Sequence, residues 1–144
     1  MILLDTNVLS EFMRPQPSAQ VVAWLDAQPV RQLWTSAISR AEIELGLALM
    51  PSGKRQKGLS LAAQMMFEED FAGRCLSFDE SAASCYARIV AARTRLGRPI
   101  SVEDAQIAAI AQTHQMAVAT RNISDFDHIE GLSVVDPWNA SVKN

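Results

Sequence analysis

The chain has 144 residues, 49% of them apolar and 20% charged, and its net charge at pH 7 is −3. These values are typical of one globular domain over residues 1–144 with a core of its own, and they argue against a disordered chain. No apolar stretch approaches the roughly 18 residues that a membrane-spanning helix needs, and the negative charge argues against an indiscriminate nucleic-acid binder.

The first predicted element is a short apolar strand that ends at an acid. Residues 1–7 read Met-Ile-Leu-Leu-Asp-Thr-Asn, and three apolar residues followed by a carboxylate are typical of a buried parallel strand. Asp5 therefore falls at the carboxyl end of that strand, where open α/β sheets place their ligand clefts. Thr6 and Asn7 are common helix-capping residues, so we expect a short helix to start there.

The rest of the chain alternates between helix and strand patterns. Further helices are predicted over 18–27, 39–50, 59–71, 80–96 and 101–114, and further strands over 32–36, 74–78, 117–120 and 133–135. Ser39 and Glu42 have the spacing of a capping box, which would open the helix over 39–50. The basic run over 54–57 is expected to be a loop or a first helical turn. The alternation favours an α/β domain with a parallel sheet of about five short strands, covered by helices on both faces.

Cys75 and Cys85 are the only two cysteines. They are ten residues apart with no His nearby, which indicates two reduced thiols in a cytosolic protein rather than a metal or redox site. The first strand begins at residue 1 without a basic segment before it, so no signal peptide is expected. We therefore expect a cytoplasmic protein with no membrane association.

One acid interrupts an apolar helix face near the middle of the first half of the chain. Glu42 shares a helical stripe with Ile38, Leu45 and Leu49. Burying an unpaired carboxylate is costly, so this arrangement needs a cation, a metal ion or exposure at the helix end. The simpler alternative is that Glu42 only closes the capping box with Ser39.

A second acid has a similar position near the start of a later helix. Asp104 shares its face with Ile107, Ala108 and Ala111. Glu103 also has apolar residues four and seven positions further on, so periodicity alone does not choose between these two acids. An acidic first turn that complements the helix dipole is the alternative explanation.

A further acid follows the fourth predicted strand. The polar segment 120–126 contains Asn122 and Asp125, and both could face the same edge of the sheet as the acid of the first strand. A solvated surface loop is the ordinary alternative, and we prefer it for Asp127 and Glu130.

Together these acids predict a divalent metal site, because strand ends and helix starts of a parallel α/β sheet converge on one edge. Clustered carboxylates are all-oxygen ligands, which favour Mg²⁺ or Mn²⁺ over zinc. His114 and His128 lack the spacing of a zinc site. No Gly-rich phosphate loop or nucleophilic triad is evident, so the indicated chemistry is metal-assisted phosphodiester hydrolysis.

Four motifs occur in order along nearly the whole chain. They are Leu4-Asp5-Thr6-Asn7-Val8; Ser36-Ala37-Ile38-Ser39 with Ala41-Glu42 and Leu45-Gly46; Asp104-Ala105-Gln106-Ile107-Ala108-Ala109; and Val118-Ala119-Thr120-Arg121-Asn122 with Asp125-Phe126. In this order they resemble the PIN-domain ribonucleases, specifically the VapC-type toxins of type II toxin–antitoxin pairs and their FitB-like branch. The resemblance implies a three-layer α/β/α fold and RNA cleavage with Mg²⁺ or Mn²⁺.

The resemblance also implies which residues form the site. The family's acids fall on Asp5, on Glu42, on Asp104 rather than its neighbour, and on a fourth acid in the polar segment after the fourth strand. Asp5 and Asp104 would be the principal metal ligands, and Glu42 would complete the site and help to deprotonate the attacking water. Asp125 is our choice for the fourth acid, where it would bind or orient a second ion or its waters, because Asn122 carries no charge.

Proteins of this family are expected to form homodimers and to be silenced by a small DNA-binding antitoxin whose tail lies across the active site. Thr6 and Thr120 would position the ligands through their hydroxyl groups. Arg121 is a candidate phosphate contact, although an Arg after a strand is as often a surface ion-pair former. A basic rim that guides RNA could be formed by Lys54, Arg55, Lys57, Arg93, Arg95 and Arg98, and solvated helix ends explain the same residues.

Three other functions fit parts of the sequence. A haloacid-dehalogenase-like phosphatase needs a second Asp two residues after the first, where this chain has Asn7. A receiver domain needs a central phosphoacceptor Asp and a late Lys, neither of which is visible. The stronger alternative is a regulator of the same fold that binds DNA only through a partner, as the FitB-like resemblance permits. The set of acids favours catalysis, because a pure scaffold has no reason to concentrate carboxylates.

Overall fold

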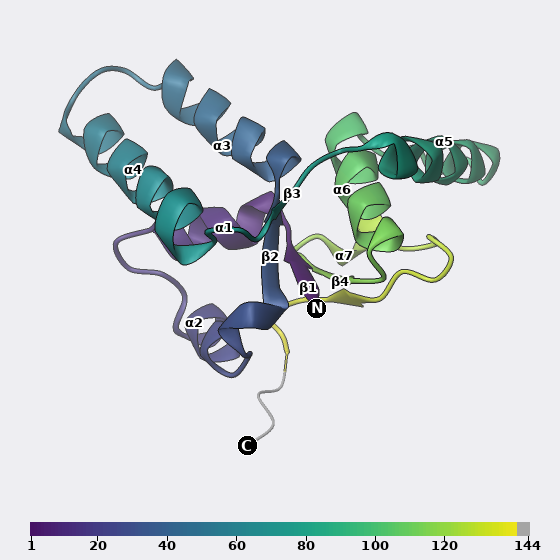
Figure 1. The fold of residues 1–144 in the computed structure, drawn as a ribbon, viewed down its shortest axis with the longest axis horizontal. Helices are drawn as coiled ribbons and strands as arrows, with labels where there is room; N and C mark the ends of the chain where they lie inside the picture. Colours follow the sequence, from purple (N-terminus) through teal and green to yellow (C-terminus); the bar gives the residue numbers. More distant parts are fainter. Residues whose placement is uncertain (141–144) are drawn as a thin grey trace.

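The structure is a computed structural model and describes residues 1–140. One parallel sheet, in the order β3-β2-β1-β4-β5, contains the strands β1 (Ile2–Leu4), β2 (Leu33–Ser36), β3 (Cys75–Leu76), β4 (Ala117–Ala119) and β5 (Val134–Val135). The helices are α1 (Thr6–Met13), α2 (Ala19–Asp26), α3 (Ala37–Leu49), α4 (Lys54–Met65), α5 (Glu80–Arg95), α6 (Val102–Thr113) and α7 (Ile123–Phe126), as Figure 1 shows. Two short turns of other helix types are η1 (Val30–Gln32) and η2 (Met66–Asp70).

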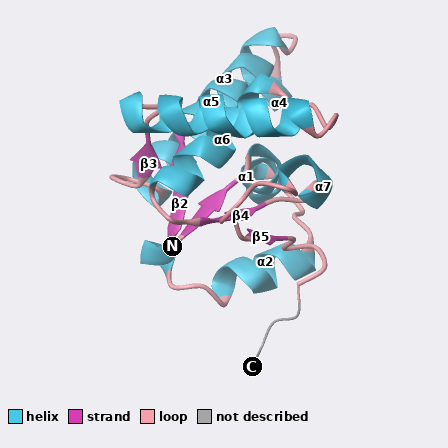
Figure 2. Cartoon of the chain, turned by 90° about the vertical axis from the view of Figure 1, so that its right-hand side faces the viewer, coloured by secondary structure: helices cyan, strands magenta, loops and turns pink. Residues whose placement is uncertain are grey.

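The sheet separates two hydrophobic cores. Leu3 and Leu4 are neighbours on β1, and successive residues of a strand point to opposite faces. Leu3 belongs to a buried cluster with side chains of α5, α6 and α7, whereas Leu4 belongs to a cluster with side chains of α1, α2, α3 and α4. In Figure 2 the strands lie between α2 on one side and α5 and α6 on the other. The expected three-layer α/β/α architecture with five parallel strands is confirmed.

Helix α3 begins earlier than the sequence predicted. Ser36, the last residue of β2, caps this helix, and its Oγ accepts the backbone N–H of Ser39 at 3.2 Å. The helix therefore starts at Ala37, and the predicted capping box of Ser39 and Glu42 is wrong. Ser36 satisfies one of the unpaired N–H groups of the first turn, so the chain passes directly from strand to helix.

Two other segments differ from the prediction. The basic run over 54–57 forms the first turn of α4, which confirms one of its two predicted forms. The predicted helix start at residue 59 is wrong, because α4 begins at Lys54 and continues into the π-helical turn Met66–Asp70. The polar segment after β4 contains the short helix α7 in addition to a turn. Within residues 1–140, no helix has both the length and the apolar character needed to cross a bilayer.

Candidate active site

Asp5 lies where β1 meets α1, at the carboxyl edge of the sheet. It is only 5% exposed. Its Oδ1 accepts the backbone N–H of Thr6 at 2.8 Å, so the cap of α1 is Asp5, and the prediction that Thr6 or Asn7 caps this helix is wrong. Its Oδ2 accepts hydrogen bonds from Thr120 Oγ1 at 2.8 Å and from Asn7 Nδ2 at 3.2 Å. Donors from both ends of the chain therefore hold this carboxylate in one orientation.

Glu42 lies in the second turn of α3 and points to the start of α1. Thr6 Oγ1 donates to Glu42 Oε1 at 2.8 Å and also lies 2.9 Å from Ser39 Oγ. The expected apolar stripe around Glu42 is not part of the core, because Leu45 is 60% and Leu49 is 77% exposed. The buried face of α3 contains other residues, and Glu42 reaches the site from the edge of the helix.

Asp104 lies in the first turn of α6 and is half-buried. Its backbone N–H donates to Oγ of Ser101, the capping residue, at 3.2 Å. Ala105 and Ile107, which follow it, are fully buried against the sheet. Glu103 is exposed and lies outside the cleft that Asp104 lines. The helix packing therefore distinguishes two adjacent acids that periodicity did not.

Asp5, Glu42 and Asp104 line one open cleft of about 540 Å³. The cleft lies where β1, α1, α3, α6 and the segment after β4 meet, which is the edge at which the acids were expected to converge. Its other lining residues are Thr6, Asn7, Ser10, Glu11, Arg14, Arg121, Asn122 and Trp138.

The three carboxylates of the cleft all have a raised pKa. Burial is the main cause in each case. The negative charges of Glu42 and Asp125 raise the pKa of Asp5 further, while hydrogen bonds from Thr120 and Thr6 lower it. Burial and the charge of Asp5 raise the pKa of Asp104 to about 6. The cleft thus concentrates negative charge that a bound cation would stabilise.

The structure places the two candidates for the fourth position differently. Asn122 lines the cleft, and its backbone N–H donates to Thr120 Oγ1 at 3.1 Å. Asp125 is exposed on α7 and is not among the residues that line the cleft. Its charge nevertheless raises the pKa of Asp5 and of Asp104, so it lies within electrostatic reach of both carboxylates.

The donor set of the cleft fits a divalent metal ion that prefers oxygen ligands. Within residues 1–140, no three His, Cys, Asp or Glu side chains are close enough to enclose a metal ion as they stand. Asp5, Glu42 and Asp104 nevertheless line one cleft, and among the described residues none of the three carboxylates has a Lys or Arg partner within 4.0 Å. A hard divalent cation such as Mg²⁺, which takes carboxylate oxygens as ligands, would balance the negative charge of these residues.

Glu11 and Trp138 are among the cleft residues that the sequence analysis missed, and Ser10 and Arg14 are two others. Glu11 is buried on α1, accepts the backbone N–H of Ser18 at 2.8 Å and pairs with Arg14 at 3.1 Å. These two contacts, the first being stronger, hold the pKa of Glu11 below its usual value. Its place three residues after buried Val8 is a periodicity signal that could have identified it. Trp138 follows β5, and no local pattern connects it to the site.

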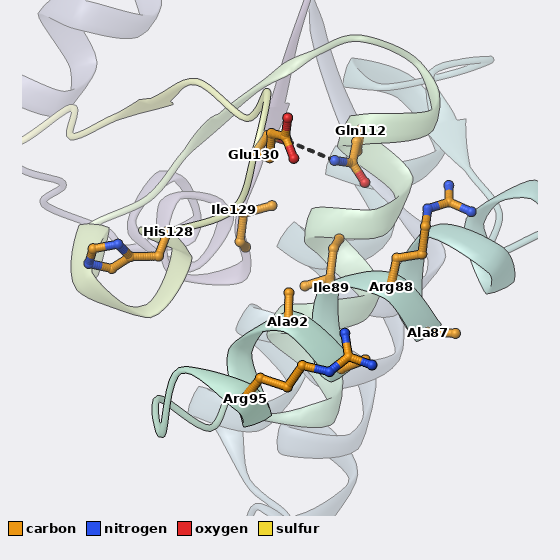
Figure 3. Close-up of a pocket in the computed structure, with 10 residues that line it drawn as sticks. Ala87, Arg88, Ile89, Ala92, Arg95, Gln112, His128, Ile129 and Glu130 are labelled. Atoms are coloured by element: carbon orange, nitrogen blue, oxygen red, sulfur yellow. Dashed lines mark hydrogen bonds between the residues drawn. The ribbon is translucent and has the colours of Figure 1, made fainter.

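The basic residues expected to form one rim are in different places. Lys54 and Arg55 line a larger groove of about 1030 Å³ between α1, α3 and α4. Thr6 and Glu42 belong to both this groove and the acidic cleft, so the two adjoin. Arg95 lines a separate pocket of about 500 Å³ between α5, α6 and the segment after α7 (Figure 3), where Glu130 is the only carboxylate among the lining residues.

Arg93 is a structural residue and not part of a rim. It is only 4% exposed, and its guanidinium donates to the backbone carbonyls of Arg98, Asp125 and Asp127. A buried guanidinium that bonds three carbonyls is not available to RNA, so the expectation of a rim that includes it is wrong. Arg93 instead connects the end of α5 to the segment around α7.

Comparisons with known proteins show what this chain is similar to. Residues 2–132 match the PIN domain family. The chain is 43% identical over 139 residues to the toxin FitB of Neisseria gonorrhoeae, which covers 96% of this chain and 99% of that protein. It is 42% identical over 138 residues to the VapC ribonuclease Y4jK of Sinorhizobium fredii, covering 96% and 98%. The solved structure of FitAB bound to a DNA fragment has a TM-score of 0.84 and 43% identity, covering 98% of each chain.

Proposed function

The chain belongs to the PIN-domain family, and we propose that it is the toxin of a toxin–antitoxin pair, an endoribonuclease that hydrolyses RNA with a divalent metal ion. The observation that carries this proposal is the cleft in which Asp5, Glu42 and Asp104 meet from three distant segments of the chain. Hydrolysis of a phosphodiester is the reaction for which such a carboxylate cleft is suited. The names of two relatives, a toxin and a VapC ribonuclease, support the same function.

The proposed metal ion is Mg²⁺, with Mn²⁺ as an alternative. Asp5 and Asp104 would be its principal ligands, and Glu42 would complete the site. Asp125 would bind or orient a second ion or its waters, which its electrostatic reach to Asp5 and Asp104 supports. A divalent ion bound there supplies positive charge for the phosphate oxygens and makes a water molecule more acidic.

The remaining groups of the cleft hold the carboxylates and move a proton. The raised pKa of Glu42 makes this carboxylate a stronger base, so we propose that it accepts the proton of the attacking water. Thr6 Oγ1, 2.8 Å from Glu42 Oε1, orients that base. Thr120 Oγ1 orients the carboxylate of Asp5 by donating to Oδ2, while Oδ1 accepts the backbone N–H of Thr6 at the start of α1.

We further propose that a small DNA-binding antitoxin silences the protein, and that the protein is a homodimer. The antitoxin tail would lie across the cleft. The groove between α1, α3 and α4 supports this, because it joins the cleft at Glu42 and has apolar walls that include Met13, Leu47 and Leu59. An apolar segment seated in this groove would place its neighbouring residues over the carboxylates.

The second candidate function is a regulator that binds DNA through its partner, with little or no nuclease activity. The observation in its favour is the similarity to FitAB, whose solved structure contains a DNA fragment. A short neighbouring reading frame that encodes a ribbon-helix-helix or AbrB-like protein would support an antitoxin partner for both functions. Cleavage of RNA by the purified protein distinguishes the two.

The decisive experiment is a cleavage assay on RNA with Mg²⁺, with Mn²⁺ and with excess chelator. We expect cleavage only with a metal ion, and none by Asp5→Asn or Asp104→Asn. Glu103→Gln is the matched control and should retain most of the activity, because Glu103 lies outside the cleft and acts on it only by helping to raise the pKa of Glu42 and Asp104. Cleavage in chelator, or undiminished cleavage by Asp5→Asn, would contradict the metal mechanism, and no cleavage under any condition would favour the regulator.

A further inference from the structure

We propose that Arg121, held against the ring of Trp138, binds a phosphate group of the RNA beside the carboxylates. Both residues line the acidic cleft, and the guanidinium carbon of Arg121 lies 5.0 Å from the centre of the Trp138 ring. This inference rests on the proposed ribonuclease function and adds a substrate-binding element to it.

The backbone of Arg121 is connected to the proposed metal ligand by one side chain. Asn7 Oδ1 accepts the backbone N–H of Arg121 at 3.2 Å, and Asn7 Nδ2 donates to Asp5 Oδ2 at 3.2 Å. The position of Arg121 is therefore coupled to the position of Asp5. A phosphate that contacted both the guanidinium and a metal ion on Asp5 would therefore bind two residues that one hydrogen-bond network holds together.

The guanidinium of Arg121 has its donors available. Over residues 1–140 the Arg121 guanidinium makes no hydrogen bond to the protein and no ion pair within 4.0 Å. It makes a cation–π contact with the Trp138 ring, and its charge helps to lower the pKa of Glu11 without an ion pair. Arg14, the other cation of the cleft, is already paired with Glu11 at 3.1 Å. A cation–π contact with a ring restricts the position of a guanidinium while leaving its N–H groups free for a two-point contact with an oxyanion.

Trp138 is itself held in place by the segment after β5. Its backbone N–H donates to Asp136 Oδ1 at 2.9 Å, and Asn139 Nδ2 donates to the other oxygen of the same carboxylate at 2.7 Å. The indole packs against the core cluster that also contacts Met13 and Val135. Trp138 lies beyond residue 132, where the match to the PIN domain family ends, so this support for Arg121 comes from the chain's own C-terminal segment.

A phosphate is the ligand that this arrangement fits. The carboxylates alone would repel RNA, and a guanidinium without an ion-pair partner in the same cleft gives the substrate a positive contact beside the acids. An arginine also stabilises negative charge that develops on phosphate oxygens during hydrolysis. Arg121 and Trp138 thus have separate roles: the first contacts the phosphate, and the second positions the first.

The test measures binding of a fluorescently labelled single-stranded RNA of mixed sequence, in an Asp104→Asn background that removes cleavage, over a series of salt concentrations. Arg121→Ala should weaken binding by about tenfold or more, since a charge-assisted hydrogen bond is lost. It should also reduce the slope of log K against log salt by about 0.7, the value for one single-strand phosphate contact. Arg31→Ala is the charge-matched control, because Arg31 is exposed just before β2, at the opposite edge of the sheet.

A double-mutant cycle tests the role of Trp138. Trp138→Leu should weaken RNA binding, whereas the double variant with Arg121→Ala should bind no more weakly than Arg121→Ala alone. Trp138→Phe, which keeps an aromatic face, should restore most of the binding. Mn²⁺ affinity, measured with the Asp104 side chain intact, should not fall in Arg121→Ala, which separates this role from damage to the metal site.

The experiments distinguish a failure of this inference from a failure of the proposed ribonuclease function. If Arg121→Ala binds RNA with the same affinity and salt slope as its parent while the wild-type protein cleaves RNA, this inference is wrong and the ribonuclease function stands. If the wild-type protein neither binds nor cleaves RNA, the proposed function itself is overturned. Additive effects of Trp138→Leu and Arg121→Ala would show that Trp138 does not act through Arg121.

Discussion

Thr120 Oγ1 donates a hydrogen bond to Asp5 Oδ2 at 2.8 Å, although the two residues are 115 positions apart. The cause is the parallel pairing of β1 with β4, in which Leu4 is the register partner of Ala119. Each of the two residues comes next after its strand, so both reach the same edge of the sheet. The strand register therefore determines the orientation of the proposed metal ligand.

The first prediction concerns this hydrogen bond. Thr120→Val keeps the shape of the buried side chain and removes the donor, so we expect the free energy of unfolding to fall by about 1–3 kcal/mol. Mn²⁺ affinity should weaken by about 10- to 100-fold, because the ligand loses its orienting partner. Urea denaturation and metal titration measure these effects. Thr113→Val is the control, since the partners of Thr113 Oγ1 within residues 1–140 are the carbonyl of Ala109 and Sγ of Cys85. Equal metal affinities for the two variants would contradict the prediction.

The second prediction concerns the pH dependence of stability without metal. The pKa of Asp104 is about 6 in the folded protein, above its usual value of 3.8. The folded chain therefore retains a proton that the unfolded chain has released, and its contribution to stability is full below about pH 4 and is lost as the pH rises through about 6. In excess chelator, Asp104→Asn should be more stable than the wild type near neutral pH, and this difference should vanish in acid. Thermal denaturation over that range measures it, and a difference independent of pH would count against it.

The same protonation should oppose metal binding. A carboxylate must lose its proton before it coordinates a metal ion, so Mn²⁺ affinity should fall as the pH drops below about 6. Titration of Mn²⁺ at several pH values checks this expectation. Glu11 has a lowered pKa and a protein partner, so Glu11→Gln should leave the midpoint of the pH dependence unchanged. A shifted midpoint in that variant would show that Glu11 contributes to the pH dependence attributed to Asp104.

The fourth prediction separates Asp125 from Asn122. We expect Asp125→Asn to reduce the rate of RNA cleavage by about tenfold or more, because it removes a charge that orients an ion or its waters. Asn122→Ala should have the smaller effect, although Asn122 lines the cleft. Single-turnover cleavage at saturating Mn²⁺ compares the two variants. The reverse order of effects would move the fourth position to Asn122.

The fifth prediction concerns the biological role. Induced expression of the wild-type chain should arrest bacterial growth, and co-expression of the cognate antitoxin should restore it. Asp5→Asn should be harmless at the same expression level, because it removes a principal metal ligand. Growth curves with immunoblots for expression level measure this, and sequencing of RNA ends after brief induction would identify the cut sites. Arrest by Asp5→Asn would assign the toxicity to something other than RNA cleavage.

Local sequence patterns determined the elements and the edge at which the acids meet. The apolar run before Asp5 and the alternation of helix and strand patterns predicted the order of the longer elements, whereas the caps of α1 and α3, the start of α4 and the short helix α7 differed. These features depend on backbone preferences within a few residues of one another. The expectation that the acids meet at one edge then followed from the general rule that ligand sites lie at the carboxyl ends of parallel strands.

Only the tertiary structure decided which side chains share the site. Periodicity placed Leu45 in an apolar stripe, but α3 buries another face. Arg93 was expected in a basic rim, but it is buried and donates to three backbone carbonyls. Trp138, which no local pattern connected to the site, reaches the cleft from beyond the last strand. Each of these positions depends on which helix packs beside which and on the register of strands far apart in sequence. A single helix or strand pattern contains no information about such contacts. Asp5 was therefore determined by the sequence around it, whereas its neighbours in the cleft were determined by the fold.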